Sequence, residues 1–220
     1  PAQFRAARAW LDRLPAPVVF APGNHDVPMW RFWERTLAPF GAWRRHFAPE
    51  LERDFGDAEL AVVAVTTAFA WTIKHGRLSA RQLADLDRRL ATLPPGAARV
   101  VVAHHPLVAA PELGPEPVAA NSGRALALLE ARGVELVLSG HLHHGFVLPA
   151  APGRTPAVVH CGTTSSSRGR GVEAAAATLN WIEIGAESID VSRRRFDPRR
   201  GEFVEVERRS LPRPRRRAGS

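Results

Sequence analysis

Short apolar runs bounded by turn residues recur along this chain, and segments of helical period lie between the early ones. Strands are predicted for four early runs, at residues 18–21, 60–66, 100–103 and 134–138. Helices are predicted for residues 3–14, 79–93 and 122–132, the second opening with the capping box Ser79-Ala80-Arg81-Gln82. Four later runs, at 157–161, 178–184, 188–196 and 203–206, have turn residues between them. The pattern predicts alternating α/β structure followed by antiparallel β-structure.

Residues 29–55 carry many aromatic side chains among arginines, which predicts one or two short helices broken near Pro39-Phe40-Gly41. We expect these aromatic side chains to pack onto the sheet. A wall of a substrate pocket and a homodimer contact are the alternatives. The group consists of Trp30, Phe32, Trp33, Phe40, Trp43, Phe47 and Phe55.

Composition sets the broad class of the protein. The chain has 220 residues, 45% hydrophobic and 24% charged, which suits one globular domain. No run of about eighteen uncharged apolar residues occurs in the sequence, so we expect no membrane partner. The single cysteine, Cys161, cannot form an internal disulfide and is compatible with a reducing compartment, so we expect a cytoplasmic location.

The net charge of +8 is concentrated at the carboxyl end. From Arg193 onward there are eleven arginines against four acidic residues, and the rest of the chain is nearly neutral. Arginine outnumbers lysine 29 to 1, which favours biased composition over a dedicated nucleic-acid partner for this segment. Residues 208–220 lack apolar periodicity and are expected to form a disordered Arg/Pro-rich tail behind a domain of residues 1–207.

Three predicted strands end in histidine-bearing turns. The turns are Gly23-Asn24-His25-Asp26, His104-His105-Pro106, and Ser139-Gly140-His141-Leu142-His143-His144. Ligands of open α/β sheets bind at the carboxyl ends of the strands, so these side chains should meet in one crevice. His141 and His143 would point the same way if their segment stayed extended. The pattern predicts a metal site.

The three blocks, in this order, resemble the last three signature blocks of the calcineurin-like metallophosphoesterases, and look most similar to bacterial class III cyclic-nucleotide phosphodiesterases. The resemblance implies an α/β fold, a four-layer α/β/β/α sandwich of two mixed sheets, that holds two divalent metal ions. It implies metal-dependent hydrolysis of a small-molecule phosphoester, in particular a phosphodiester, by a water activated between the two ions.

Carried over by position, Asn24, His104 and His141 resemble ligands of one metal, and His143 resembles a ligand of the other. His105 matches no family ligand. Imidazole nitrogen with an amide oxygen suits Mn, Fe or Zn better than Mg or Ca.

The resemblance also assigns catalytic roles. His25 resembles the residue that contacts the phosphoryl oxygens or protonates the leaving group, with Asp26 orienting it. A neighbouring carboxylate would keep the imidazole protonated near neutral pH. Arg168 and Arg170, in the loop Thr163 to Gly171, could bind substrate phosphate, although an exposed turn is the simpler interpretation.

Two further family blocks, Asp-x-His and Gly-Asp-x-x-Asp, do not occur in this sequence. In the family they supply the carboxylate that bridges the metals, so we expect an amino-terminally truncated domain with little activity. A nuclease of the same chemistry, and an inactive module that binds phosphate or a protein, are the alternatives.

Overall fold

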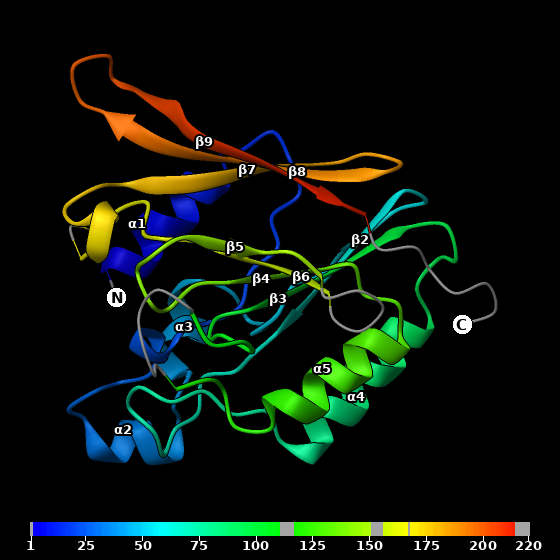
Figure 1. The fold of residues 1–220 in the computed structure, drawn as a ribbon. Coiled ribbons are helices and arrows are strands. Elements are labelled where there is room, and N and C mark those ends of the chain that lie inside the picture. The colour runs from blue at the N-terminus through cyan, green and yellow to red at the C-terminus, as the bar shows by residue number, and fades with distance from the viewer. Residues whose placement is uncertain (1, 111–116, 151–155, 167, 214–220) are drawn as a thin grey trace.

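Two β-sheets lie face to face in a computed structural model that describes residues 2–110, 117–150, 156–166 and 168–213 (Figure 1). The apolar side chains between the sheets come from both of them. Val100, Leu136 and Val159 of the larger sheet pack with Ile189 and Val191 of the smaller one, and all five are buried. This contact fixes the two sheets as one folded unit.

The larger sheet has six strands in the order β1-β2-β3-β4-β6-β5. Its four inner strands are parallel to one another, and the two edge strands are antiparallel to their neighbours. The strands are β1 (Phe55–Gly56), β2 (Leu60–Val65), β3 (Ala98–Ala103), β4 (Leu136–Ser139), β5 (Phe146–Leu148) and β6 (Ala157–His160). The sheet is therefore mixed, as predicted, and β5 is a strand that the sequence pattern did not indicate.

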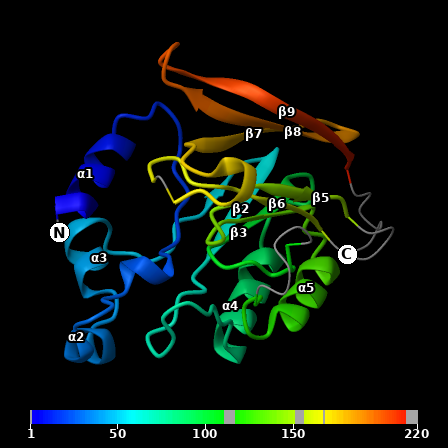
Figure 2. The ribbon, with the colours of Figure 1, turned by 60° about the vertical axis from the view of Figure 1, so that its left-hand side comes forward.

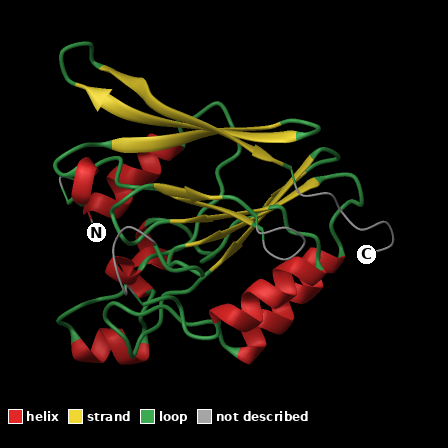
Figure 3. Cartoon of the chain, viewed as in Figure 1, coloured by secondary structure: helices red, strands yellow, loops and turns green. Residues whose placement is uncertain are grey.

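Helices α4 (Ala80–Ala91) and α5 (Ser122–Ala131) cover the outer face of this sheet (Figure 3). Their buried leucines, Leu86, Leu90 and Leu129, pack against Val63 and Val101 of the sheet. The predicted capping box at the start of α4 is confirmed, because the Ser79 hydroxyl accepts from the Gln82 backbone N–H and the Gln82 side chain accepts from the Ser79 N–H.

The smaller sheet is antiparallel throughout, in the order β7-β8-β9. Its strands are β7 (Thr178–Ile184), β8 (Ser188–Asp197) and β9 (Glu202–Pro212). Within the described ranges no helix covers its outer face (Figure 1). The predicted α/β class is confirmed. The smaller sheet is antiparallel, whereas the family resemblance implied a mixed one, and among the described residues no helical layer lies on its outer face.

The amino-terminal segment, through His46, forms a column of short helices beside the sheets (Figure 2): α1 (Ala2–Leu11), α2 (Phe32–Leu37) and α3 (Gly41–His46). Phe20, Trp43 and Phe47 form a buried aromatic cluster there, with ring centroids 4.2–5.7 Å apart. Other aromatic side chains of this segment are exposed, contrary to the expectation that they pack onto the sheet. The strand predicted at 18–21 is also wrong, because Phe20 forms only an isolated bridge with Arg53 and β1 occupies the edge beside β2.

The predicted boundary of the carboxyl-terminal tail is wrong by several residues. β9 continues through Pro212, and Arg213 forms an ion pair with the buried Glu135. Pairing with β8 and this ion pair order residues that lack apolar periodicity, while residues 214–220 lie outside the described part. In the described ranges, each helix is too short or too polar to cross a bilayer.

Candidate metal centre

The candidate site lies where the parallel strands of the larger sheet end together. The register aligns Val65 of β2 with Ala103 of β3, Ala103 with Ser139 of β4, and Ser139 with His160 of β6. The residues that follow these positions therefore leave the sheet at one edge. This is why His104 and His141, which are 37 residues apart, come together.

Asn24, His104 and His141 place three donor atoms in mutual contact. Asn24 Oδ1 lies 3.0 Å from His104 Nε2 and 3.2 Å from His141 Nδ1. The two imidazole nitrogens are 3.3 Å apart. Asn24 is buried, and its amide nitrogen donates to the Ile73 carbonyl, so Oδ1 faces the histidines. The predicted convergence is confirmed for these three residues.

This spacing fits a single metal ion. Three atoms bonded to one ion at about 2.1 Å lie about 3.0–3.4 Å apart, depending on the coordination geometry. The donor set, an amide oxygen and two imidazole nitrogens, suits a first-row transition metal or zinc. Burial and the neighbouring imidazoles, His105 first, hold the pKa of His104 well below its ordinary value, so the ring is neutral and can ligate at pH 7. The role of Asn24, His104 and His141 as metal ligands stays a prediction.

The loop after β4 adopts a conformation that the sequence pattern did not predict. His141 and His143 have positive φ angles of 75° and 56°, in the left-handed region, and the Leu142 side chain between them is buried. Non-glycine residues in this region cost about 1–3 kcal/mol and cluster at functional sites. The segment is not extended, so the argument that both imidazoles share a face is wrong.

His143 does not join the three donor atoms. Its Nδ1 atom lies 3.2 Å from the Arg168 carbonyl oxygen. In the described ranges, the histidine, cysteine or carboxylate groups close enough for one ion consist of a single set: His104, His105 and His141. His143 as the ligand of a second metal stays a prediction.

His105 is the histidine that the sequence reasoning left without a role. It is buried, its Nδ1 atom lies 2.8 Å from Thr67 Oγ1, and its ring centroid is 4.4 Å from that of His141. Burial and then the His141 charge lower the pKa of His105 to about 3. In an extended strand, adjacent side chains point to opposite faces, so the His104 and His105 rings would lie on opposite sides of the sheet. The turn after β3 brings the two rings to the same side.

His25 and Asp26 directly follow Asn24 of the triad, the name used below for Asn24, His104 and His141, but they are not arranged as the resemblance implied. The Asp26 carboxylate accepts from the Gly23 backbone N–H at 2.8 Å, so it closes its own turn instead of the His25 ring. Partial burial lowers the pKa of the His25 imidazole, and the charges of Arg168 and His143 lower it further. The expectation that a carboxylate keeps His25 protonated is therefore wrong. Burial raises the pKa of Asp26.

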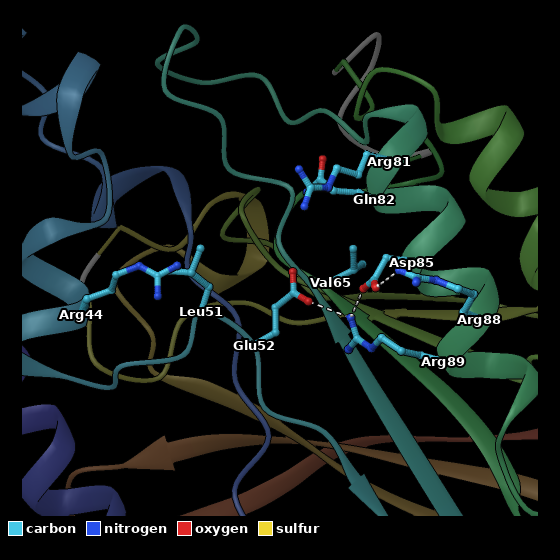
Figure 4. A pocket seen from close by; sticks show the side chains of 9 residues that line it. All are labelled: Arg44, Leu51, Glu52, Val65, Arg81, Gln82, Asp85, Arg88 and Arg89. Atoms are coloured by element: carbon cyan, nitrogen blue, oxygen red, sulfur yellow. Dashed lines mark hydrogen bonds and ion pairs between the residues drawn. The ribbon is translucent and has the colours of Figure 1, made fainter.

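A cavity of about 560 Å³ lies elsewhere, between α3 and the first turns of α4 (Figure 4). Arg89 crosses it and pairs with Glu52 at 2.8 Å and with Asp54 at 2.6 Å. These ion pairs attach the loop before β1 to α4. None of the predicted metal-binding or catalytic residues lines this cavity.

A sheet whose parallel strands end in a tight group of imidazole and amide donors is the arrangement of a metallophosphoesterase. The chain belongs to the calcineurin-like phosphoesterase family, whose model matches residues 2–145. The family indicates metal-dependent hydrolysis of phosphoesters. No curated protein matches the sequence.

Solved structures resemble the chain weakly. A dimetal phosphatase from Danio rerio is 16% identical with a TM-score of 0.45, the match covering 63% of this chain and 40% of that one. A predicted phosphoesterase from Streptococcus pneumoniae is 14% identical with a TM-score of 0.33, over 69% of this chain and 97% of that one. Vps29 from Entamoeba histolytica, complexed with Zn²⁺, is 12% identical with a TM-score of 0.32, over 68% and 98%. These three likenesses carry no functional argument, and similarity to class III cyclic-nucleotide phosphodiesterases stays a prediction.

Proposed function

We propose that this domain hydrolyses a phosphodiester with a metal-activated water, and that Asn24, His104 and His141 bind one divalent Mn, Fe or Zn ion. The single observation that supports this proposal is the set of donor atoms 3.0–3.3 Å apart at the carboxyl edge of the sheet. When bound, such an ion lowers the pKa of a coordinated water and stabilises charge on the phosphoryl oxygens. His143 is our candidate ligand of a second ion.

We propose that two further side chains handle the substrate. His25 presents an exposed imidazole that can donate a hydrogen bond to a phosphoryl oxygen or to the leaving group. The Arg168 guanidinium is close enough to affect the pKa of His25, and the Arg168 carbonyl contacts His143. We propose that Arg168 pairs with the substrate phosphate.

The nuclease alternative rested on the basic carboxyl-terminal segment. Several of its described arginines form ion pairs: Arg208 pairs with Glu205 at 2.8 Å and Arg209 with Glu207 at 2.6 Å. Arg193 also pairs with Glu207, and Arg213 with Glu135. Paired arginines release few counterions on binding nucleic acid, so these contacts favour a small-molecule phosphoester.

Metal binding and hydrolysis test the proposal together. Titration of the metal-free chain with Zn²⁺ and Mn²⁺ should give at least one ion per chain. The loaded protein should cleave bis(p-nitrophenyl) phosphate only slowly, because the two acidic family blocks do not occur in this sequence. His104→Ala should lose both properties, whereas His46→Ala, on α3 away from the triad, should keep them. Metal binding without hydrolysis would support the inactive phosphate-binding module instead, and equal metal affinity in His104→Ala would exclude the triad.

A further inference from the structure

Six large apolar side chains are exposed on α2, on the turn before it and on the loop of residues 66–76. Trp30 is 88% exposed, Leu37 77%, Trp33 72% and Trp71 67%, and Phe32 and Ile73 are also exposed. We name these six residues the aromatic surface. Single exposed apolar side chains are ordinary, but a group with three tryptophans indicates a binding face.

The two segments of the aromatic surface are joined. The Arg35 guanidinium, on α2, donates to the Pro28 carbonyl at 2.8 Å and to the Thr72 carbonyl, so α2 lies directly beside the loop that carries Trp71 and Ile73. Figures 1 and 2 both show α2 at the end of the molecule opposite the β7-β8-β9 sheet. The six side chains therefore share one end of the protein.

The charge of these segments is strongly positive. Residues 28–37 and 69–77 contain four basic residues, Arg31, Arg35, Lys74 and Arg77. They contain one acidic residue, Glu34, which pairs with Arg31 at 3.0 Å. Tryptophan and phenylalanine beside arginine and lysine are the composition of surfaces that lie in the interface of an anionic bilayer.

We propose that the aromatic surface docks the protein onto an anionic lipid bilayer, with the aromatic rings at the headgroup level and the basic side chains on lipid phosphates. A second copy of the chain fits less well, because a two-fold contact would place this basic surface against itself. The sequence predicted no membrane partner because it has no spanning run, and binding at the bilayer surface needs no such run.

Docking also has a direct structural link to the metal centre. The Asn24 amide donates to the Ile73 carbonyl at 2.9 Å. A Cβ added at Gly76, in the same loop, would lie 2.4 Å from the His105 ring. The loop that carries part of the aromatic surface therefore also contacts Asn24 and His105 at the candidate metal centre.

Vesicle binding by the full chain tests this proposal. The chain should cosediment with phosphatidylcholine vesicles that contain phosphatidylglycerol, bind pure phosphatidylcholine more weakly, and lose affinity as salt rises. Trp33→Ser should weaken binding about tenfold, since it removes one large apolar anchor. Trp181→Ser is the matched control, because Trp181 is 53% exposed on β7 in the opposite sheet. It should leave binding unchanged.

Thermal unfolding would establish that each variant is folded, as expected for exposed positions. A blue shift of tryptophan emission with anionic vesicles, reduced in Trp33→Ser, would further support docking. Absence of wild-type binding, or equal weakening by Trp33→Ser and Trp181→Ser, would overturn the proposal. A concentration-dependent dimer that Trp33→Ser abolishes, without vesicle binding, would assign the surface to a second copy instead.

Discussion

Gly23 precedes Asn24 and is buried against the His104 ring, so Gly23→Ala perturbs one metal ligand without removing any. A Cβ at this position would lie 2.6 Å from His104 Cε1, 2.8 Å from Nδ1 and 2.9 Å from Nε2. The backbone itself accepts alanine, since φ is −97° and ψ is 179°. The effect of the substitution is therefore steric.

The size of the effect follows from these distances. Carbon atoms in contact prefer about 3.5 Å, so the His104 ring must move by roughly 0.9 Å from its present position. Ligand positions tolerate only about 0.2 Å around their ideal distances. We expect metal affinity to fall at least tenfold, which is about 1.4 kcal/mol, and overpacking to lower the free energy of unfolding by about 1–3 kcal/mol.

Competition with a chromophoric chelator measures the affinity for Zn²⁺ and Mn²⁺, and circular dichroism with urea measures folding. Gly123→Ala is the matched control, because an added Cβ there meets no atom within 4 Å. It lies in α5, where alanine stabilises a helix relative to glycine, so metal affinity should not change. A folded Gly23→Ala protein with wild-type affinity for both ions would refute the assignment of His104 as a ligand.

Gly76→Ala extends the comparison to His105. The added Cβ would meet the His105 ring at 2.4–2.7 Å. If His105 only supports the fold, this variant should lose stability while metal affinity falls less than in Gly23→Ala. A larger loss of affinity in Gly76→Ala would make His105 a ligand.

Three further results are expected. Arg168→Ala should raise KM for the phosphodiester about tenfold with kcat little changed, and Arg168→Lys should restore part of the loss. An unchanged KM would show that Arg168 does not bind the substrate and belongs only to an exposed turn. His160 is buried against Phe146, and burial lowers its pKa to about 3. Below about pH 6.5, His160 therefore binds a proton in the unfolded chain but stays neutral in the folded chain. As the pH is lowered from 6.5 to 3, the free energy of unfolding should therefore decrease, by up to about 1.4 kcal/mol per pH unit from this residue. Urea unfolding of His160→Leu at pH 7 and pH 5 should show a smaller decrease than the wild type. Arg213→Ala leaves the buried Glu135 carboxylate without that partner and should lower the free energy of unfolding by about 3 kcal/mol. The loss should be smaller in a background of Glu135→Gln. Equal unfolding curves for the wild type and Arg213→Ala would show that this ion pair does not stabilise the fold.

Much of the site was predictable because its signals are local. A strand that ends in glycine or histidine is visible in the sequence, and the parallel order of such strands places their ends at one edge. The positions of His104 and His141 follow from this rule, whereas Asn24 follows no strand and reaches the site from the short helical turn Asn24–Asp26. Helix α4 was equally visible, because a capping box and helical spacing both depend on residues within a few turns.

The remaining features depend on contacts between distant residues. Whether residues 18–21 pair as a strand depends on which segment occupies the edge beside β2, and β1 occupies it. Asp26 had two acceptable partners, and the turn geometry gave the carboxylate to Gly23 instead of His25. The exposure of Trp30 and Trp33 could not be predicted from their hydrophobicity, because burial requires a second surface, and no described segment covers those two side chains.

By itself the sequence determined most of the order of strands and helices and the residue types that can hold a metal, because both depend on spacing and side-chain chemistry. The strand predicted at 18–21 was wrong, and β1 and β5 were not predicted. Only the tertiary structure decided which donors touch, that His105 joins the group, and that β9 extends through Pro212. The physical reason is that metal-ligand distances and strand pairing are fixed to fractions of an ångström by packing across the whole chain, whereas local patterns fix only the direction in which each side chain leaves the backbone.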